Sequence, residues 1–65
     1  MQNERLERMM QIVFDLKKET RYIKSEGCWY WRDRDDESVG PDDFPERRFP
    51  TFLEAVQDIC APYLD

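Results

Sequence analysis

The sequence predicts a small α+β domain with the order helix, strand, strand, helix (α-β-β-α). An apolar stripe at spacings of three and four predicts a long N-terminal helix, and a Thr-x-x-Glu capping signal at Thr51 predicts a C-terminal one. The aromatic run at residues 28–32 predicts a strand, because aromatic side chains favour strands. A chain of 65 residues is long enough for one domain, so we expect a single domain over residues 1–65.

The composition describes a strongly charged chain that is also rich in aromatic side chains. Charged residues make up 38% of it, above the usual ~25%. The aromatic share is 14%, and disordered chains are poor in aromatics, so we expect a folded domain. The net charge is −5, with an excess of bases in residues 1–24 and a large excess of acids in residues 25–65. Nucleic acid and anionic membranes should repel the acidic part, which favours a protein partner with a basic surface.

The first helix is predicted over about residues 4–24, after Asn3 as an acceptable N-cap. Its apolar stripe consists of Leu6, Met9, Met10, Val13, Leu16, Thr20 and Ile23. An alternative is that residues 20–23 form a strand, with residues 25–27 as a three-residue hairpin loop that places Gly27 in the left-handed conformation. We prefer the helix, because its period continues through Ile23.

The strand at residues 28–32 places the two tryptophans on one face, and Tyr30 and Arg32 on the other. A charged turn follows, and residues 38–39 are predicted to return as a very short second strand of the hairpin. We expect the tryptophans to face the core, because the helices supply few large residues to cover the sheet. Tyr30 and Arg32 would then face outward, although the sequence leaves the opposite orientation open.

Residues 40–50 carry three of the four prolines and predict an irregular, extended loop. The second helix follows Thr51, whose hydroxyl should accept from the Glu54 amide while the Glu54 carboxylate reaches back to the Thr51 amide. Its predicted apolar face consists of Phe52, Ala55, Val56, Ile59, Cys60 and Tyr63. Pro62 should end the regular helix near Ala61 or allow one further turn.

The sequence favours a cytoplasmic protein with reduced thiols. The first residues contain no apolar signal-peptide region, and apolar runs such as residues 12–14 are far too short to span a bilayer. In that compartment a disulfide between Cys28 and Cys60 is only a minor alternative.

The residue types argue against catalysis and against metal or cofactor binding. The chain has no histidine, the commonest general acid and base, and Cys28 is better interpreted as a small buried thiol than as a nucleophile. The acids after Asp33 do not fit an EF-hand, since Ser38 and Phe44 stand where Gly and Glu are needed. Two isolated glycines make no phosphate-binding loop. We therefore expect a protein that is not an enzyme and uses no cofactor and no metal.

Two surface features predict binding of a macromolecule. Carboxylates spaced along residues 33–43 can imitate a row of phosphates, as in small acidic inhibitors of nucleic-acid-binding proteins. Aromatic and Arg side chains in the strand are typical of interface hot spots. We expect a non-enzymatic protein-binding module, most specifically an inhibitor or modulator of a basic protein. The predicted partner-binding residues are Tyr30, Arg32, Asp33, Asp35, Asp36, Glu37, Asp42 and Asp43.

The alternative function is a homo-oligomeric structural or accessory subunit, such as a homodimer. In that case Met9, Met10 and Phe14 of the first helix, together with the aromatic strand, would pack between copies.

Overall fold

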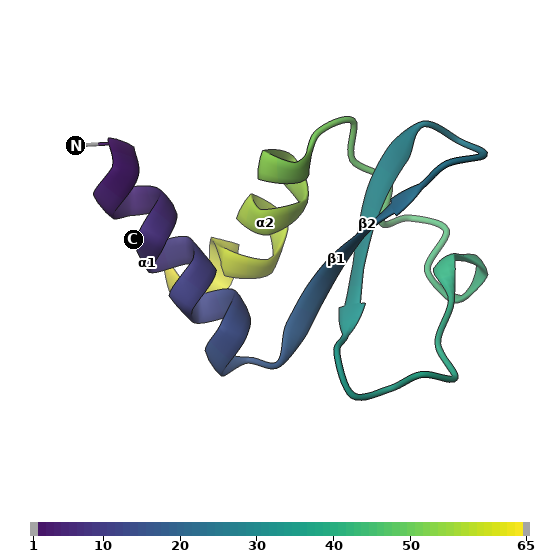
Figure 1. Ribbon diagram of the computed structural model, residues 1–65, viewed down its shortest axis with the longest axis horizontal. Coiled ribbons are helices and arrows are strands. Elements are labelled where there is room, and N and C mark those ends of the chain that lie inside the picture. The colour runs from purple at the N-terminus through teal and green to yellow at the C-terminus, as the bar shows by residue number, and fades with distance from the viewer. Residues whose placement is uncertain (1, 65) are drawn as a thin grey trace.

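The computed structural model describes the backbone of residues 2–64 and the side chains of residues 4–64. The elements in chain order are helix α1 (Gln2–Asp15), strands β1 (Lys18–Ile23) and β2 (Cys28–Asp33), the 3-10 turn η1 (Pro41–Asp43), helix α2 (Phe52–Cys60) and the 3-10 turn η2 (Ala61–Tyr63). The order α-β-β-α confirms the predicted fold class. Figure 1 shows both helices on one side of the β1–β2 hairpin and the long loop after β2 on the other.

Helix α1 is shorter than the sequence predicts, and the strand alternative for residues 20–23 is the correct one. The helix ends at Asp15, and Lys17 takes a left-handed backbone conformation (φ 57°) that turns the chain into β1. Strand β1 is stabilised by its pairing with the aromatic residues of β2. The helical spacing of apolar residues contains no information about this pairing. The helix also begins earlier than predicted, at Gln2, so Asn3 lies within it and is not its N-cap.

The hairpin is antiparallel, with Thr20 opposite Trp31 and Ile23 opposite Cys28. Four residues, 24–27, connect the strands, and Gly27 adopts the left-handed conformation (φ 69°) expected of a glycine that closes a hairpin loop. The connecting loop is therefore one residue longer than the three-residue alternative, because Ile23 is the last residue of β1.

Strand β2 forms backbone hydrogen bonds on both of its edges. On one edge it pairs with β1, and on the other Trp29 exchanges two backbone hydrogen bonds with Phe49, at N···O distances of 2.7 and 2.9 Å. The predicted second strand at residues 38–39 is wrong, since this segment forms no strand. The hairpin partner of β2 precedes it in the sequence instead of following it.

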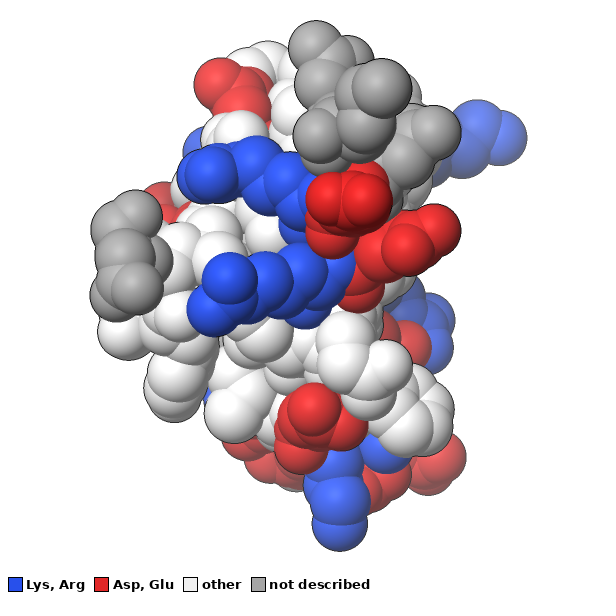
Figure 2. All heavy atoms as spheres, turned by 90° about the vertical axis from the view of Figure 1, so that its left-hand side faces the viewer, with Lys and Arg blue, Asp and Glu red and all other residues white. Residues whose placement is uncertain are grey.

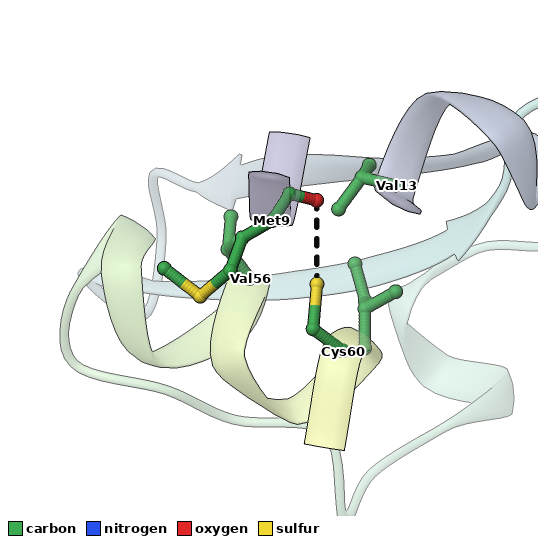
Figure 3. Close-up of a cluster of buried hydrophobic side chains, with 5 residues drawn as sticks. Met9, Val13, Val56 and Cys60 are labelled. Atoms are coloured by element: carbon green, nitrogen blue, oxygen red, sulfur yellow. Dashed lines mark hydrogen bonds between the residues drawn. The ribbon is translucent and has the colours of Figure 1, made fainter. Parts of the chain in front are cut away.

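The core lies between the two helices and extends onto the tryptophan face of the hairpin. It is formed by Met9, Val13, Val56, Ile59 and Cys60, with Trp31 packed against it. Figure 3 shows the side chain of Cys60 between the helices, where its thiol donates to the carbonyl oxygen of Met9 (3.3 Å). Among the helices of the described chain, none is both long and apolar enough to cross a membrane.

Helix α2 begins where the capping signal predicts. The Thr51 hydroxyl oxygen accepts from the Glu54 amide at 3.1 Å, which confirms half of the capping box. The Glu54 carboxylate accepts from the Thr51 hydroxyl (3.3 Å) instead of from the amide. The predicted apolar face is buried at Ala55, Val56, Ile59 and Cys60, whereas Phe52 and Tyr63 are exposed.

Candidate protein-binding site

The loop that follows β2 covers the face of the hairpin that carries Tyr30 and Arg32. Tyr30 is only 5% exposed and Arg32 only 7% exposed. The expectation that these two side chains face outward is therefore wrong. Trp29 and Trp31 lie on the helix-facing side, as expected, but are half-buried. Both faces of β2 are thus covered, one by helices and the other by the loop.

Arg32 connects the loop to the hairpin through hydrogen bonds and an ion pair. Its guanidinium donates to the carbonyl oxygens of Asp36 (2.8 Å) and Val39 (3.0 Å) and forms an ion pair with Glu19 of β1 (2.8 Å). Partial burial acts to raise the pKa of the Glu19 carboxyl. The hydrogen bonds and charges of Arg32 and Arg21 together outweigh burial and hold this pKa below its usual value.

Arg47 and Arg48 hold the later part of the same loop. The guanidinium carbon of Arg47 lies 3.6 Å from the ring centre of Trp31 and 3.7 Å from that of Phe44, so the cation lies between two aromatic rings. Arg48 donates to the carbonyl oxygens of Phe44 (3.0 Å) and Pro41 (3.2 Å).

Arg48 also binds Glu26 in the turn between the strands, through its Nε at 2.9 Å. This hydrogen bond raises the pKa of the Arg48 guanidinium above its ordinary value. Arg32 and Arg48 are thus turned toward backbone carbonyls of the loop, and Arg47 donates to the carbonyl oxygen of Trp31 in β2 (3.2 Å).

The acidic side chains of the loop are left at the surface. Of the six predicted acids, five are exposed and Asp36 is half-buried. Three arginines of the same region are directed inward instead: Arg32, Arg47 and Arg48 donate to backbone carbonyls. Arg34 stays beside the carboxylates, 3.9 Å from Asp35.

Three of the predicted acids surround one groove. Asp33, Asp35 and Asp36 line an open hollow of about 470 Å³ beside Leu16 and Lys17, at the junction between α1 and β1. The other three, Glu37, Asp42 and Asp43, belong to the same loop but are not among the groove's lining residues. We call the lining of this hollow the acidic groove.

Several groove carboxylates already have an internal contact. Asp33 pairs with Lys18, and Asp35 lies 3.9 Å from the Nε of Arg34. Asp36 accepts from the backbone (3.3 Å) and hydroxyl (2.6 Å) of Ser38, which shapes the loop. Because the Lys18 and Arg34 contacts lie at the surface, each is weak and exchangeable with a base from a partner.

The surface around α1 carries charges of both signs (Figure 2). Figure 2 views it from the side of α1 and shows acidic and basic side chains next to one another, with uncharged surface between them. A mixed arrangement of this kind gives no focused field of one sign. The acidic groove is therefore the better candidate for binding a basic partner.

The remaining chemistry-bearing residues do not form a reactive cluster within the described part of the chain. Cys28 and Cys60 are both free thiols, and no group of three or more metal-ligating side chains comes together there. Burial raises the pKa of the Cys60 thiol, so it is a poor nucleophile.

Comparison of the chain with protein-family models, with curated proteins and with solved structures finds no match.

Proposed function

We propose that this protein is a non-enzymatic binding module whose acidic groove receives Lys or Arg side chains of a basic protein partner, as an inhibitor or modulator would. The observation that carries the proposal is the sorting of charge in the loop. Asp33, Asp35 and Asp36 line one open groove, while Arg32 before them and Arg48 after them bind backbone carbonyls. Arg34, between them, lies beside Asp35 at the surface.

The net charge of −5 supports the same proposal. Negative charge steers a basic partner toward the protein at long range, and carboxylates in a concave site give the encounter its orientation. This binding should weaken as salt increases, because surface charges are screened beyond about 8–10 Å at physiological ionic strength. We place the interaction in the cytoplasm, where Cys28 and Cys60 remain reduced.

The test compares two double variants that remove the same amount of charge. Asp35→Asn with Asp36→Asn neutralises the groove, and the amide oxygen introduced at position 36 can still accept from Ser38. Glu4→Gln with Glu7→Gln removes two exposed charges from α1 and is the matched control. Both are compared with the unaltered protein as bait in a pull-down from native lysate at low and high salt, and the retained protein is then titrated by calorimetry.

We expect the groove variant to lose at least about tenfold in affinity, a loss of one or two charge-assisted contacts. The control should bind as the unaltered protein does, and high salt should release the partner. The proposal fails if no protein is retained at low salt, or if the groove variant retains it as well as the control.

A further inference from the structure

Strand β1 has a free edge. The sheet contains β1 and β2 alone, and the second edge of β2 is occupied by Phe49. No other strand of the described chain lies beside β1. A row of backbone donors and acceptors along such an edge is a template for pairing with another strand.

The pairing pattern of the hairpin shows which residues of β1 point outward. Trp29 directs its N–H and C=O away from β1, toward Phe49. Hydrogen-bonded and non-hydrogen-bonded pairs alternate in an antiparallel ladder, and Tyr22 is the residue opposite Trp29. Tyr22, and with it Thr20 and Lys18, therefore present their backbone groups at the free edge.

The sequence of β1 is self-complementary about Thr20. When a second copy of β1 lies antiparallel to the first with Thr20 opposite Thr20, Glu19 of each copy faces Arg21 of the other, and Lys18 faces Tyr22. Lys18, Thr20 and Tyr22, whose backbone groups face the free edge, then each lie in a hydrogen-bonded pair with the second copy. Opposite charges directly across strands are favourable, and a Lys beside a Tyr ring adds a cation–π contact.

Neighbouring registers are unfavourable for two reasons. Moving the pairing by one residue turns the side chains to the wrong face of the sheet. Moving the two-fold axis from Thr20 to Glu19 or to Arg21 places two like charges directly opposite each other. Charged residues on an edge strand usually prevent pairing, but here one register makes them complementary.

An apolar groove lies where the second strand would be. It has a volume of about 260 Å³ and is lined by Met10, Val13 and Phe14 of α1 together with Lys18, Glu19, Thr20 and Arg34. Phe14 is 63% exposed and Tyr22 is 54% exposed, so both side chains have surface available for a contact. Tyr22 of a second copy, opposite Lys18, would point to the helix side of the sheet, toward this groove.

We propose that a second copy of this chain binds the free edge of β1, with Thr20 on the two-fold axis, so that two hairpins join into one four-stranded antiparallel sheet. The interface is isologous: each copy supplies the same edge and the same apolar groove. It differs from the dimer expected from sequence, because Met9 is buried in the core and β2 has both edges occupied. The proposal does not rest on the acidic groove, so either can fail without the other.

The first test is the mass of the particle by sedimentation equilibrium from micromolar to millimolar concentration. We expect the unaltered chain to approach twice the 8.0 kDa of one copy. Arg21→Glu should weaken the dimer at least about tenfold, because Glu19 of each copy then faces a second carboxylate across the strands. Lys24→Glu makes the same charge change in the exposed turn beyond β1 and should leave the mass unchanged.

The second test checks the register. Thr20→Cys, in a chain that also carries Cys28→Ser, should form a disulfide-linked dimer under mild oxidation, since paired Cα atoms lie about 5.5 Å apart. Ser25→Cys in the same background is the control, because two copies of position 25 would lie roughly 30 Å apart at about 3.4 Å per residue. Circular dichroism shows whether each variant folds.

A monomer at all concentrations would overturn the proposal, as would equal dimerisation of Arg21→Glu and Lys24→Glu. Efficient cross-linking at position 25 but not at position 20 would also overturn it, because it would place the contact elsewhere.

Discussion

Single arginine side chains organise the irregular third of this protein. Arg32 binds two loop carbonyls and Glu19, and Arg48 binds two more carbonyls and Glu26. A guanidinium can do this because it presents five donors in a fixed planar arrangement. The pair of Arg32 with Glu19 matters most, since the arginine is buried and would be costly to leave without its carboxylate.

Replacement of Glu19 should lower stability in a pH-dependent way. We expect Glu19→Gln to reduce the free energy of unfolding at pH 7 by roughly 1.5–3 kcal/mol, the usual range for a hydrogen bond to a charged group. The pKa of Glu19 is lowered in the folded state, so the unfolded state takes up the proton first as pH falls. Its stabilising contribution is complete well above the ordinary Glu pKa of about 4.3 and is lost below it.

The measurement is urea unfolding of the two proteins between pH 7 and pH 3. The difference between them should shrink as pH falls through the lowered pKa of Glu19. Glu4→Gln, which alters an exposed carboxylate of α1, is the control and should show no such difference. A difference that stays constant over the whole range would contradict the assignment.

At the scale of elements, the boundary between α1 and β1 depends on pairing, whereas the start of α2 depends on local chemistry. Residues 18–23 fit a helical period as well as a strand, and the aromatic residues of β2 decide between them. Thr51 instead caps α2 through a bond between residues three apart, which the sequence shows directly.

Removal of the Thr51 cap should therefore have a local and moderate effect. We expect Thr51→Ala to lower the free energy of unfolding by about 1 kcal/mol, because the Glu54 amide loses its acceptor. Thr51→Ser keeps the hydroxyl and should stay close to the unaltered protein. Thermal unfolding followed by circular dichroism measures both variants, and an equal loss in the two would show that the methyl group, not the cap, is responsible.

At the scale of the whole molecule, stability comes from one small core between α1, α2 and the tryptophan face of the hairpin. Cys60 lies at its centre, is 0% exposed and donates to the Met9 carbonyl (Figure 3). Cys28, at the start of β2, is half-buried. The two thiols therefore report on different events: Cys28 on access to the folded protein, and Cys60 on opening of the core.

We expect iodoacetamide to modify Cys28 in the folded protein and Cys60 only when the core opens. Burial raises the pKa of the Cys60 thiol and also blocks the reagent, so both effects act in the same direction. Mass spectrometry over time should show one label first, and a second label whose rate increases with urea. The variant Cys28→Ser should lose the fast label, and two labels at equal rates would contradict the core placement.

The sequence by itself determined those features that depend on interactions between neighbouring residues. The N-terminal helical stripe, the strand at the aromatic run, the Thr51 cap, the end of α2 before Pro62 and the acidic character of residues 33–43 are all properties of neighbouring residues. The two helices and the strand at the aromatic run could be predicted for that reason, whereas the other strand of the α-β-β-α order lies at residues 18–23 and not at 38–39.

Only the tertiary structure decided the rest, because those features depend on residues far apart in the chain. Strand β1 exists through its pairing with β2, and the burial of Tyr30 and Arg32 depends on a loop that covers them from the other side. The inward direction of the loop arginines is likewise set by backbone carbonyls that these side chains reach only in the folded chain. A count of charges along the sequence therefore does not show that Arg32, Arg47 and Arg48 point inward while most of the loop carboxylates stay exposed.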